Sequence, residues 1–150
     1  MGYQQKNILF LVRKGQESLI NRYEDLKGLK IEAKRKTAYF KRFDEDTALN
    51  KQENNDDDNM VRMFEKGRFD TMPVLDPVAL ENVMAKYNIT NYAYANYKYV
   101  QKVGNYYGMS KKSSKAGIYH QLNENLLNMA KSGKVTEIYL RYGIEPPVQD

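Results

Sequence analysis

The stretch that decides the fold of this chain reads Asn59-Met-Val-Arg-Met-Phe-Glu-Lys-Gly-Arg-Phe-Asp-Thr-Met-Pro-Val-Leu-Asp76. Apolar residues recur at helical spacing from Met60, and Gly67 is suited to end that helix because glycine takes a positive φ at little cost. Residues 69–75 have the length and apolar character of a buried strand, and Asp76 stands where this strand gives way to the next helix. Sheets of α/β proteins bind ligands at the carboxyl ends of their strands, so Asp76 is the leading site candidate.

The composition indicates a polar chain of one domain or two small lobes. It has 150 residues, a formal net charge of +5 and no cysteine, and its mean hydropathy is −0.78. No apolar run approaches the roughly 18 residues that span a bilayer. The absence of cysteine excludes disulfides and thiolate metal sites. The basic residues are spread along the chain, which argues against a nucleic-acid partner.

Apolar patterning places strands and helices in alternation. Strands are expected at 7–12, 30–33, 69–75, within 88–101 and at 106–110; helices are expected at 17–23, 38–49, 60–66, from 77 onward, at 116–131 and at 135–142. Residues 50–59 are polar and without periodicity, which favours a loop. The alternation predicts an α/β fold with a largely parallel sheet.

Few residues suit catalysis or metal binding. His120 is the single histidine and lies in an expected helix, where a packing or surface role is the ordinary one. Acidic residues at 53 and 56–58 do not have calcium-loop spacing. The 13 tyrosines include a group at 92–107, which favours strand packing over an aromatic wall for a ligand. We expect neither an enzyme nor a cofactor or metal site.

Several short segments nevertheless occur in a recognisable order. They are Val12-Arg-Lys-Gly15, Tyr23-Glu-Asp-Leu-Lys-Gly28, Arg35-Lys-Thr-Ala-Tyr39, Met63-Phe-Glu-Lys-Gly-Arg-Phe-Asp70 followed by Asp76, Tyr107-Gly-Met-Ser-Lys-Lys-Ser113, and Ser132-Gly-Lys-Val-Thr-Glu-Ile-Tyr-Leu-Arg-Tyr-Gly143. This ordered set resembles the second half of a family 3 extracellular solute-binding protein, one of the type II periplasmic binding proteins that serve polar amino-acid uptake. The resemblance covers nearly the whole chain and rests on the order of the segments, because none of them is specific alone.

The resemblance implies a fold of two α/β lobes with a ligand between them. Residues 1–102 would form the complete second lobe, and residues 103–150 the C-terminal part of the first lobe. The N-terminal half-lobe and the signal peptide of the family are missing, so we expect a fragment of a longer protein that is periplasmic or extracellular. A lobe without half of its strands exposes apolar surface, which predicts self-association of this chain.

The resemblance also implies the ligand-binding residues Asp76, Thr37, Arg35 and Lys36. Asp76 matches the aspartate that takes the ligand ammonium, although a helix N-cap is its ordinary alternative. Thr37 matches a hydroxyl that binds the ligand carboxylate, again with a helix cap as the alternative. Lys36 stands where the family has glycine, and Arg35 fits a solvated basic residue better than a ligand clamp. Asp70, just before the strand, is expected to be structural.

The function implied is solute capture by closure of two lobes, without chemistry, for a polar amino acid or similar small solute. In an ABC-type uptake system a separate membrane permease and ATPase complete transport. A ligand-sensing or accessory module of the same fold, in a signalling or cell-wall protein, is the alternative, and a basic nucleic-acid-binding module is a third interpretation. The family's carboxylate-binding arginine lies in the missing half, so we expect this chain alone to bind amino acids poorly or not at all.

Overall fold

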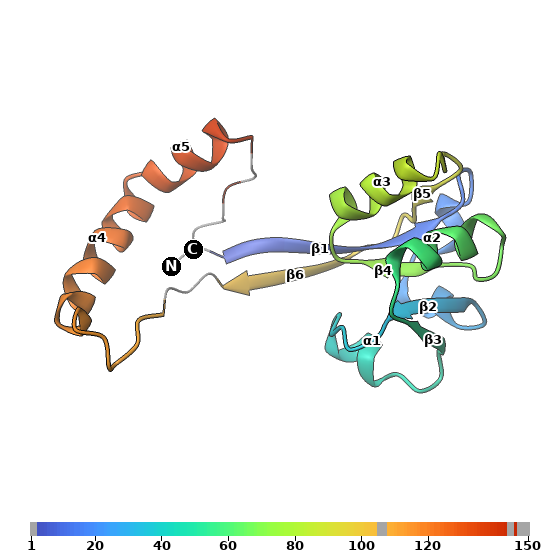
Figure 1. Ribbon diagram of the computed structural model, residues 1–150, viewed down its shortest axis with the longest axis horizontal. Helices are drawn as coiled ribbons and strands as arrows, with labels where there is room; N and C mark the ends of the chain where they lie inside the picture. Colours follow the sequence, from blue (N-terminus) through green and yellow to red (C-terminus); the bar gives the residue numbers. More distant parts are fainter. Residues whose placement is uncertain (1–2, 105–107, 144–145, 147–150) are drawn as a thin grey trace. The chain divides into compact units, whose positions relative to one another are not determined.

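The computed structural model describes residues 3–104, 108–143 and 146 (Figure 1). The chain divides into two compact units, one of residues 7–100 and one of residues 1–6 together with 101–150. Within the described ranges, no helix combines the length and the apolar character that a bilayer crossing requires.

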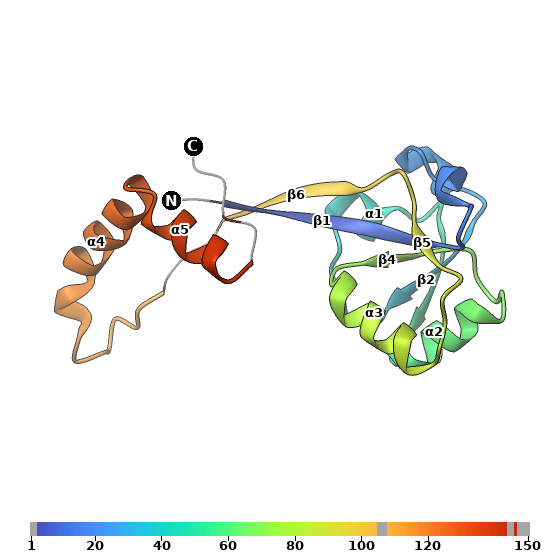
Figure 2. The ribbon, with the colours of Figure 1, turned by 90° about the horizontal axis from the view of Figure 1, so that it is seen from above.

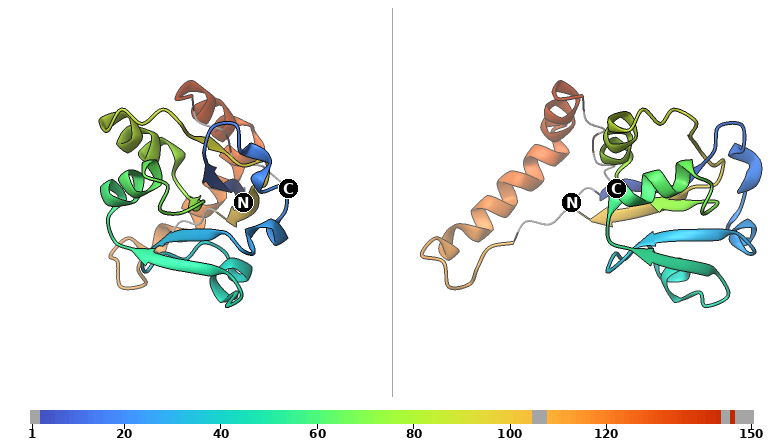
Figure 3. Two further views of the ribbon diagram at one scale, coloured as in Figure 1. Left: turned by 90° about the vertical axis from the view of Figure 1, so that its right-hand side faces the viewer. Right: turned by 45° about the vertical axis from the view of Figure 1, so that its right-hand side comes forward.

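The described strands form a four-stranded sheet and a two-stranded sheet, which a bridge joins side by side. They are β1 (Tyr3–Val12), β2 (Lys30–Lys34), β3 (Asn50–Asn54), β4 (Met72–Val74), β5 (Ala93–Tyr94) and β6 (Tyr99–Gly104). β1 pairs with β4, β5 and β6. β2 pairs with β3, and the two are the light-blue and teal strands in Figure 3. A parallel bridge between Ile31 and Thr71 joins the two groups, and the Glu32 N–H donates to the Thr71 carbonyl at 3.0 Å. The strands of residues 7–100 therefore follow one another in the order β3, β2, β4, β1, β5.

The strand directions correct the expectation of a largely parallel sheet. β2 and β3 are parallel, with Ile31 opposite Lys51, and the bridge at Ile31 is also parallel. β1 runs antiparallel both to β4, with Phe10 opposite Pro73, and to β5. The expectation failed because the alternation of strands and helices does not reveal the direction of β1, which enters from the other unit.

Helices lie on both faces of this sheet. α2 (Asp57–Glu65) and α3 (Pro77–Lys86) cover one face, and α1 (Lys41–Glu45) lies on the other (Figure 2). Side chains alternate between the two faces of β1, so this strand contributes residues to two hydrophobic cores, one on each face. Ile8, Phe10 and Val12 pack with Phe43 of α1 and its neighbours. Leu11 packs with the buried apolar residues of α2 and α3, which include Phe64 and Met84.

The segment after β2 differs most from the sequence-based expectation. The helix expected at 38–49 is wrong: only Lys41–Glu45 is helical. The apolar residues of this segment are buried by aromatic packing and not by a long helix: Phe43 is held between aromatic rings that include Phe10 and Tyr39. The loop expected at 50–59 is also wrong, since β3 and the start of α2 occupy it. β3 is polar because it is an edge strand, and such strands carry charged side chains.

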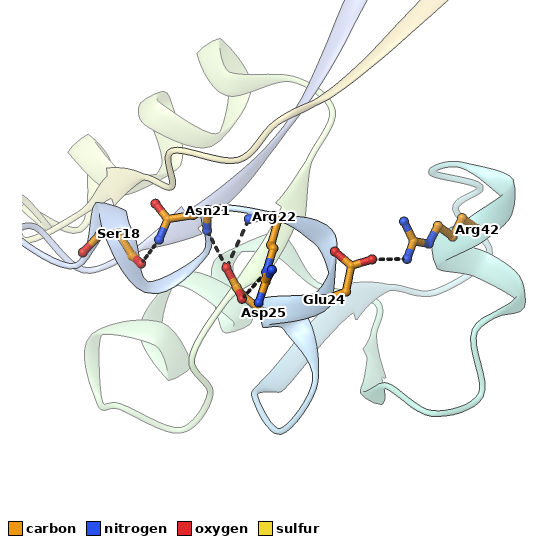
Figure 4. Close-up of polar contacts among 6 residues, drawn as sticks. All are labelled: Ser18, Asn21, Arg22, Glu24, Asp25 and Arg42. Atoms are coloured by element: carbon orange, nitrogen blue, oxygen red, sulfur yellow. Dashed lines mark hydrogen bonds and ion pairs between the residues drawn. The ribbon is translucent and has the colours of Figure 1, made fainter.

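The corner after β1 is made of two 3-10 turns, η1 (Glu17–Leu19) and η2 (Tyr23–Leu26), in place of the expected helix at 17–23. The Asp25 carboxylate fixes this corner by accepting the backbone N–H groups of Asn21 and Arg22 at 2.9 and 3.1 Å (Figure 4). These hydrogen bonds, the first with Asn21, lower the pKa of the Asp25 carboxyl. Glu24 pairs with Arg42 at 2.6 Å and ties the corner to α1.

The helices of the C-terminal segment match the expectation. A 3-10 turn, η3 (Ala116–Ile118), leads into α4 (Tyr119–Lys131), and α5 (Lys134–Arg141) follows. Gly133 separates the two helices with a φ of 78°. No residue of η3, α4 or α5 is buried. Of the strand expected at 106–110, residues 106 and 107 lie outside the described residues, and residues 108–110 are not in a strand.

Candidate functional site

The candidate site lies where three parallel strands end. β2, β3 and β4 point the same way, so Lys34, Asn54 and Val74 lie at one edge of the sheet. The turn after β2, the start of α2 and the start of α3 follow these strand ends directly. This edge, where an α/β sheet binds ligands, therefore gathers a loop and two helix N-termini.

Asp76 lies at this edge as the N-cap of α3. Its side chain accepts the Ala79 N–H at 3.0 Å, and Pro77 occupies the first position of the helix. The predicted cap is therefore confirmed. The side chain is exposed, and its second carboxylate oxygen has no hydrogen bond or ion pair with any described residue. One oxygen of Asp76 thus serves the helix, while the other remains able to accept a hydrogen bond.

Thr37 belongs to a turn rather than to a helix. Its N–H donates to the Lys34 carbonyl at 3.3 Å, and the N-cap of α1 is Phe40, without a side-chain hydrogen bond. The alternative that Thr37 caps the following helix is therefore wrong. The turn needs a positive φ at Lys36, which has φ 58°. Glycine takes this conformation without strain, so Lys36 occupies a backbone position for which glycine is suited.

Arg35 is directed to the neighbouring strand. Its side chain lies 3.4 Å from the Glu53 carboxylate, and its N–H donates to the Asn54 carbonyl at 2.9 Å. This pairing places Arg35 beside β3.

A hollow of about 390 Å³ brings two of the four candidate residues together. Thr37 and Asp76 both line it, whereas Arg35 and Lys36 do not. The lining is mostly apolar and comes from α2, β4 and α3 and the loops beside them. The full set is Lys34, Thr37, Tyr39, Asp57, Met60, Met72, Pro73, Val74, Leu75, Asp76, Ala79, Leu80 and Val83.

Three polar residues of this hollow were not among the sequence-based candidates: Lys34, Tyr39 and Asp57. Lys34 Nζ lies 2.6 Å from the Asp57 carboxylate. The Tyr39 hydroxyl accepts the Lys34 N–H at 2.9 Å, which leaves its own proton free to donate. Burial raises the pKa of the Tyr39 hydroxyl, so the group is neutral near pH 7. The sequence did indicate on which face of the sheet Lys34 lies. Side chains alternate along a strand, so Lys34 lies on the other face of β2 from Ile31 and Ala33.

Residues elsewhere take structural roles. Asp70 accepts the Lys30 N–H at 2.7 Å, which confirms the structural role expected for it. Tyr97 and Tyr99 pack against one core and Tyr92 and Tyr94 against the other. The strand packing predicted for this group is confirmed for Tyr94 and Tyr99, whereas Tyr92 and Tyr97 pack from loops and Tyr106 and Tyr107 lie outside the described residues. A second hollow of about 480 Å³, beside residues 108–120, contains His120 but none of the four candidate residues. Within the described part of the chain, no group of three or more His, Asp or Glu side chains is placed to hold a metal.

Comparison with solved structures identifies the fold. An ancestral arginine-binding protein bound to glutamine is 22% identical, with a TM-score of 0.57, over 94% of this chain and 61% of that one. An ancestral arginine-binding protein bound to arginine has a TM-score of 0.54 at 22% identity, over 93% and 61% of the two chains. The amino acid ABC transporter substrate-binding protein AbpA from Streptococcus pneumoniae Canada MDR_19A, bound to L-arginine, is 14% identical, with a TM-score of 0.53, over 91% and 56% of the two chains.

The chain has a substrate-binding-protein fold. These identities are low, so the likeness establishes the fold and leaves the function to be argued from the site. The chain spans less than two thirds of the length of these solved structures. No protein-family model matches the sequence, and no curated protein matches it.

Proposed function

We propose that this chain supplies one wall of the binding site of a solute-binding protein. Residues 7–100 would form the second lobe, and the C-terminal segment would be part of the first. The ligand is a small solute with an amine, such as an amino acid, which is bound without chemistry. The observation that carries the proposal is the presence of Asp76 and Thr37 in one hollow at the carboxyl edge of the sheet.

The groups of the hollow suit the two ends of an amino acid. The free oxygen of Asp76 can accept a hydrogen bond from an ammonium, and hydrogen bonds between charged groups are about twice as strong as neutral ones. The hydroxyls of Thr37 and Tyr39 can donate to a carboxylate, and the Thr37 hydroxyl has no hydrogen-bond partner among the described residues. Donors and an acceptor thus face the same 390 Å³ of space.

A single wall should bind weakly. Closure of two lobes on a ligand draws its free energy from contacts that both lobes make in the closed state. This wall offers two hydroxyls and one carboxylate that is not held in an ion pair, so we expect dissociation constants in the millimolar range, about 4 kcal/mol of binding free energy. Micromolar binding of a standard amino acid by this chain would contradict that expectation.

The test uses the methionine methyl groups as reporters. Met60 and Met72 line the hollow, whereas Met84 does not. Titration with millimolar L-glutamine should shift the methyl NMR signals of Met60 and Met72 and leave that of Met84 in place. Asp76→Asn should abolish these shifts, because asparagine keeps the helix cap but removes the charge that holds the ammonium.

Asp56→Asn is the matched control. Asp56 caps α2 by accepting the Asp58 N–H at 3.0 Å, and it does not line the hollow. The variant should respond as the unmodified chain does. If the unmodified chain shows no shift, or if Asp76→Asn responds like Asp56→Asn, the proposal is wrong.

The remaining parts of the proposal concern the whole protein. In an ABC-type uptake system the loaded binding protein would act in the periplasm or outside the cell and deliver the solute to a membrane permease. This chain would also self-associate, because the helices of its C-terminal segment leave Ile118, Leu122 and Met129 from 36% to 49% exposed, and exposed apolar stripes favour association.

A further inference from the structure

An ion pair between Lys34 and Asp57 forms part of the wall of the hollow. Lys34 Nζ lies 2.6 Å from the Asp57 carboxylate, and the two side chains are 46% and 52% exposed. Lys34 is the last residue of β2, and Asp57 lies in the first turn of α2. A ligand that enters the hollow therefore meets both charges.

Asp57 is the member of its acidic segment that faces the hollow. Glu53 lies 3.4 Å from Arg35, and Asp58 lies 2.9 Å from Lys86. Asp56 caps α2. Each of these other carboxylates is engaged outside the lining of the hollow.

The charges of the hollow leave one net negative charge. Lys34, Asp57 and Asp76 are the charged residues among the lining side chains. Lys34 and Asp57 neutralise each other, so the net charge is that of Asp76, which the ligand amine uses. The lining beyond these residues is largely apolar, with Leu75 43% exposed.

We propose that Lys34 determines the ligand class: by occupying Asp57, it restricts this wall to amines whose side chain is uncharged. A positively charged side chain would have to displace Lys34 from Asp57 and would be repelled by it, and a negatively charged side chain would compete with Asp57 for Lys34. An apolar or neutral side chain meets neither cost. This inference rests on the proposed function and assigns specificity to Lys34 in the same hollow.

The experiment compares two ligands that differ mainly in charge, L-norleucine and L-lysine. The methyl signals of Met60 and Met72 give the two dissociation constants. The unmodified chain should bind norleucine more tightly. Lys34→Met should free Asp57 and tighten lysine binding about fivefold relative to norleucine binding, as expected for an exposed ion pair.

Two further variants separate the explanations. Lys86→Met removes a lysine that is paired with Asp58, outside the hollow, and it should leave the preference unchanged. Asp57→Asn leaves Lys34 unpaired, so L-glutamate should gain affinity relative to L-glutamine.

The outcomes also distinguish this inference from the proposed function. If Lys34→Met leaves the lysine-to-norleucine ratio unchanged while the shifts still depend on Asp76, the role of Lys34 is refuted and the binding site stands. If neither ligand gives Asp76-dependent shifts, the binding site itself is refuted.

Discussion

Replacing Glu32 by glutamine should stabilise this protein near pH 7. Glu32 lies in the middle of β2, and its side chain is 3% exposed. Burial raises the pKa of its carboxyl, and a hydrogen bond with Asn54 opposes the rise. No described cation forms an ion pair with it: the lysine and arginine pairs nearby go to other carboxylates. Above its folded pKa the protein therefore carries a buried charge without a counter-charge.

The sign and size of the effect follow from the burial. A carboxyl with a raised folded-state pKa favours the native state below its ordinary value of 4.5 and loses that advantage as the pH rises through the folded pKa. Glutamine has nearly the same shape and keeps a hydrogen-bonding amide, but it has no charge to bury. We expect Glu32→Gln to raise the free energy of unfolding by about 1–2 kcal/mol near pH 7.

Urea unfolding of both proteins at two pH values measures this difference. The gain should be present near pH 7 and should shrink toward zero near pH 4, where the native glutamate is protonated. Glu53→Gln is the control, because Glu53 is exposed and paired with Arg35, and its effect should stay within about 0.5 kcal/mol. A Glu32→Gln variant that is less stable near pH 7, or equally shifted at both pH values, would refute the reasoning.

Three other predictions concern strain, an unsatisfied hydroxyl and association. Lys36→Gly should raise the free energy of unfolding by about 0.5–1 kcal/mol, and with it the melting temperature, because Lys36 has φ 58°. An unchanged or lower melting temperature would contradict a strained turn. Thr71→Val should be neutral or stabilising in urea unfolding, because the Thr71 hydroxyl is buried without a partner among the described atoms; a loss above about 1 kcal/mol would show a missed hydrogen bond. Light scattering should show that the chain associates and that Leu122→Ser with Met129→Ser reduces association, whereas Val78→Ser, at a 68% exposed position of α3, does not; a monomeric chain with cooperative unfolding would contradict this.

Elements with local signals were predictable from the sequence. The helix after Asp76 has a cap and a proline in adjacent positions, and both act within one turn. α4 and α5 have regular apolar spacing, and Gly133 marks the break between them. These features need no information about distant residues.

Elements that depend on distant contacts were not predictable. Phe40 is buried because it stacks on Tyr99, at 3.9 Å between ring centres, and not because a long helix contains it. β3 has no apolar alternation, since it is a polar strand at the sheet edge, and its pairing with β2 provides its order.

The same limit explains the site. Asp76 and Thr37 follow strands that the sequence indicated, so both were among the candidates. Asp57 reaches Lys34 because β3 returns the chain beside β2 before α2 begins. Because the sequence did not predict β3, the position of residues 53–58 relative to the candidate site was unknown, and the ion pair could not be inferred.

The lack of buried side chains in the C-terminal helices has a consequence for amide hydrogen exchange. α4 and α5 bury no side chain, and isolated helices shorter than about 12–15 residues are marginal in water. Their amides should open by local fraying, at free energies far below that of global unfolding. The amides of residues 8–12 in β1 and those of β2 lie beside fully buried side chains such as Phe10 and Ile31 and should exchange only when residues 7–100 unfold together. Deuterium uptake would therefore divide this one chain into a slow segment and a fast one.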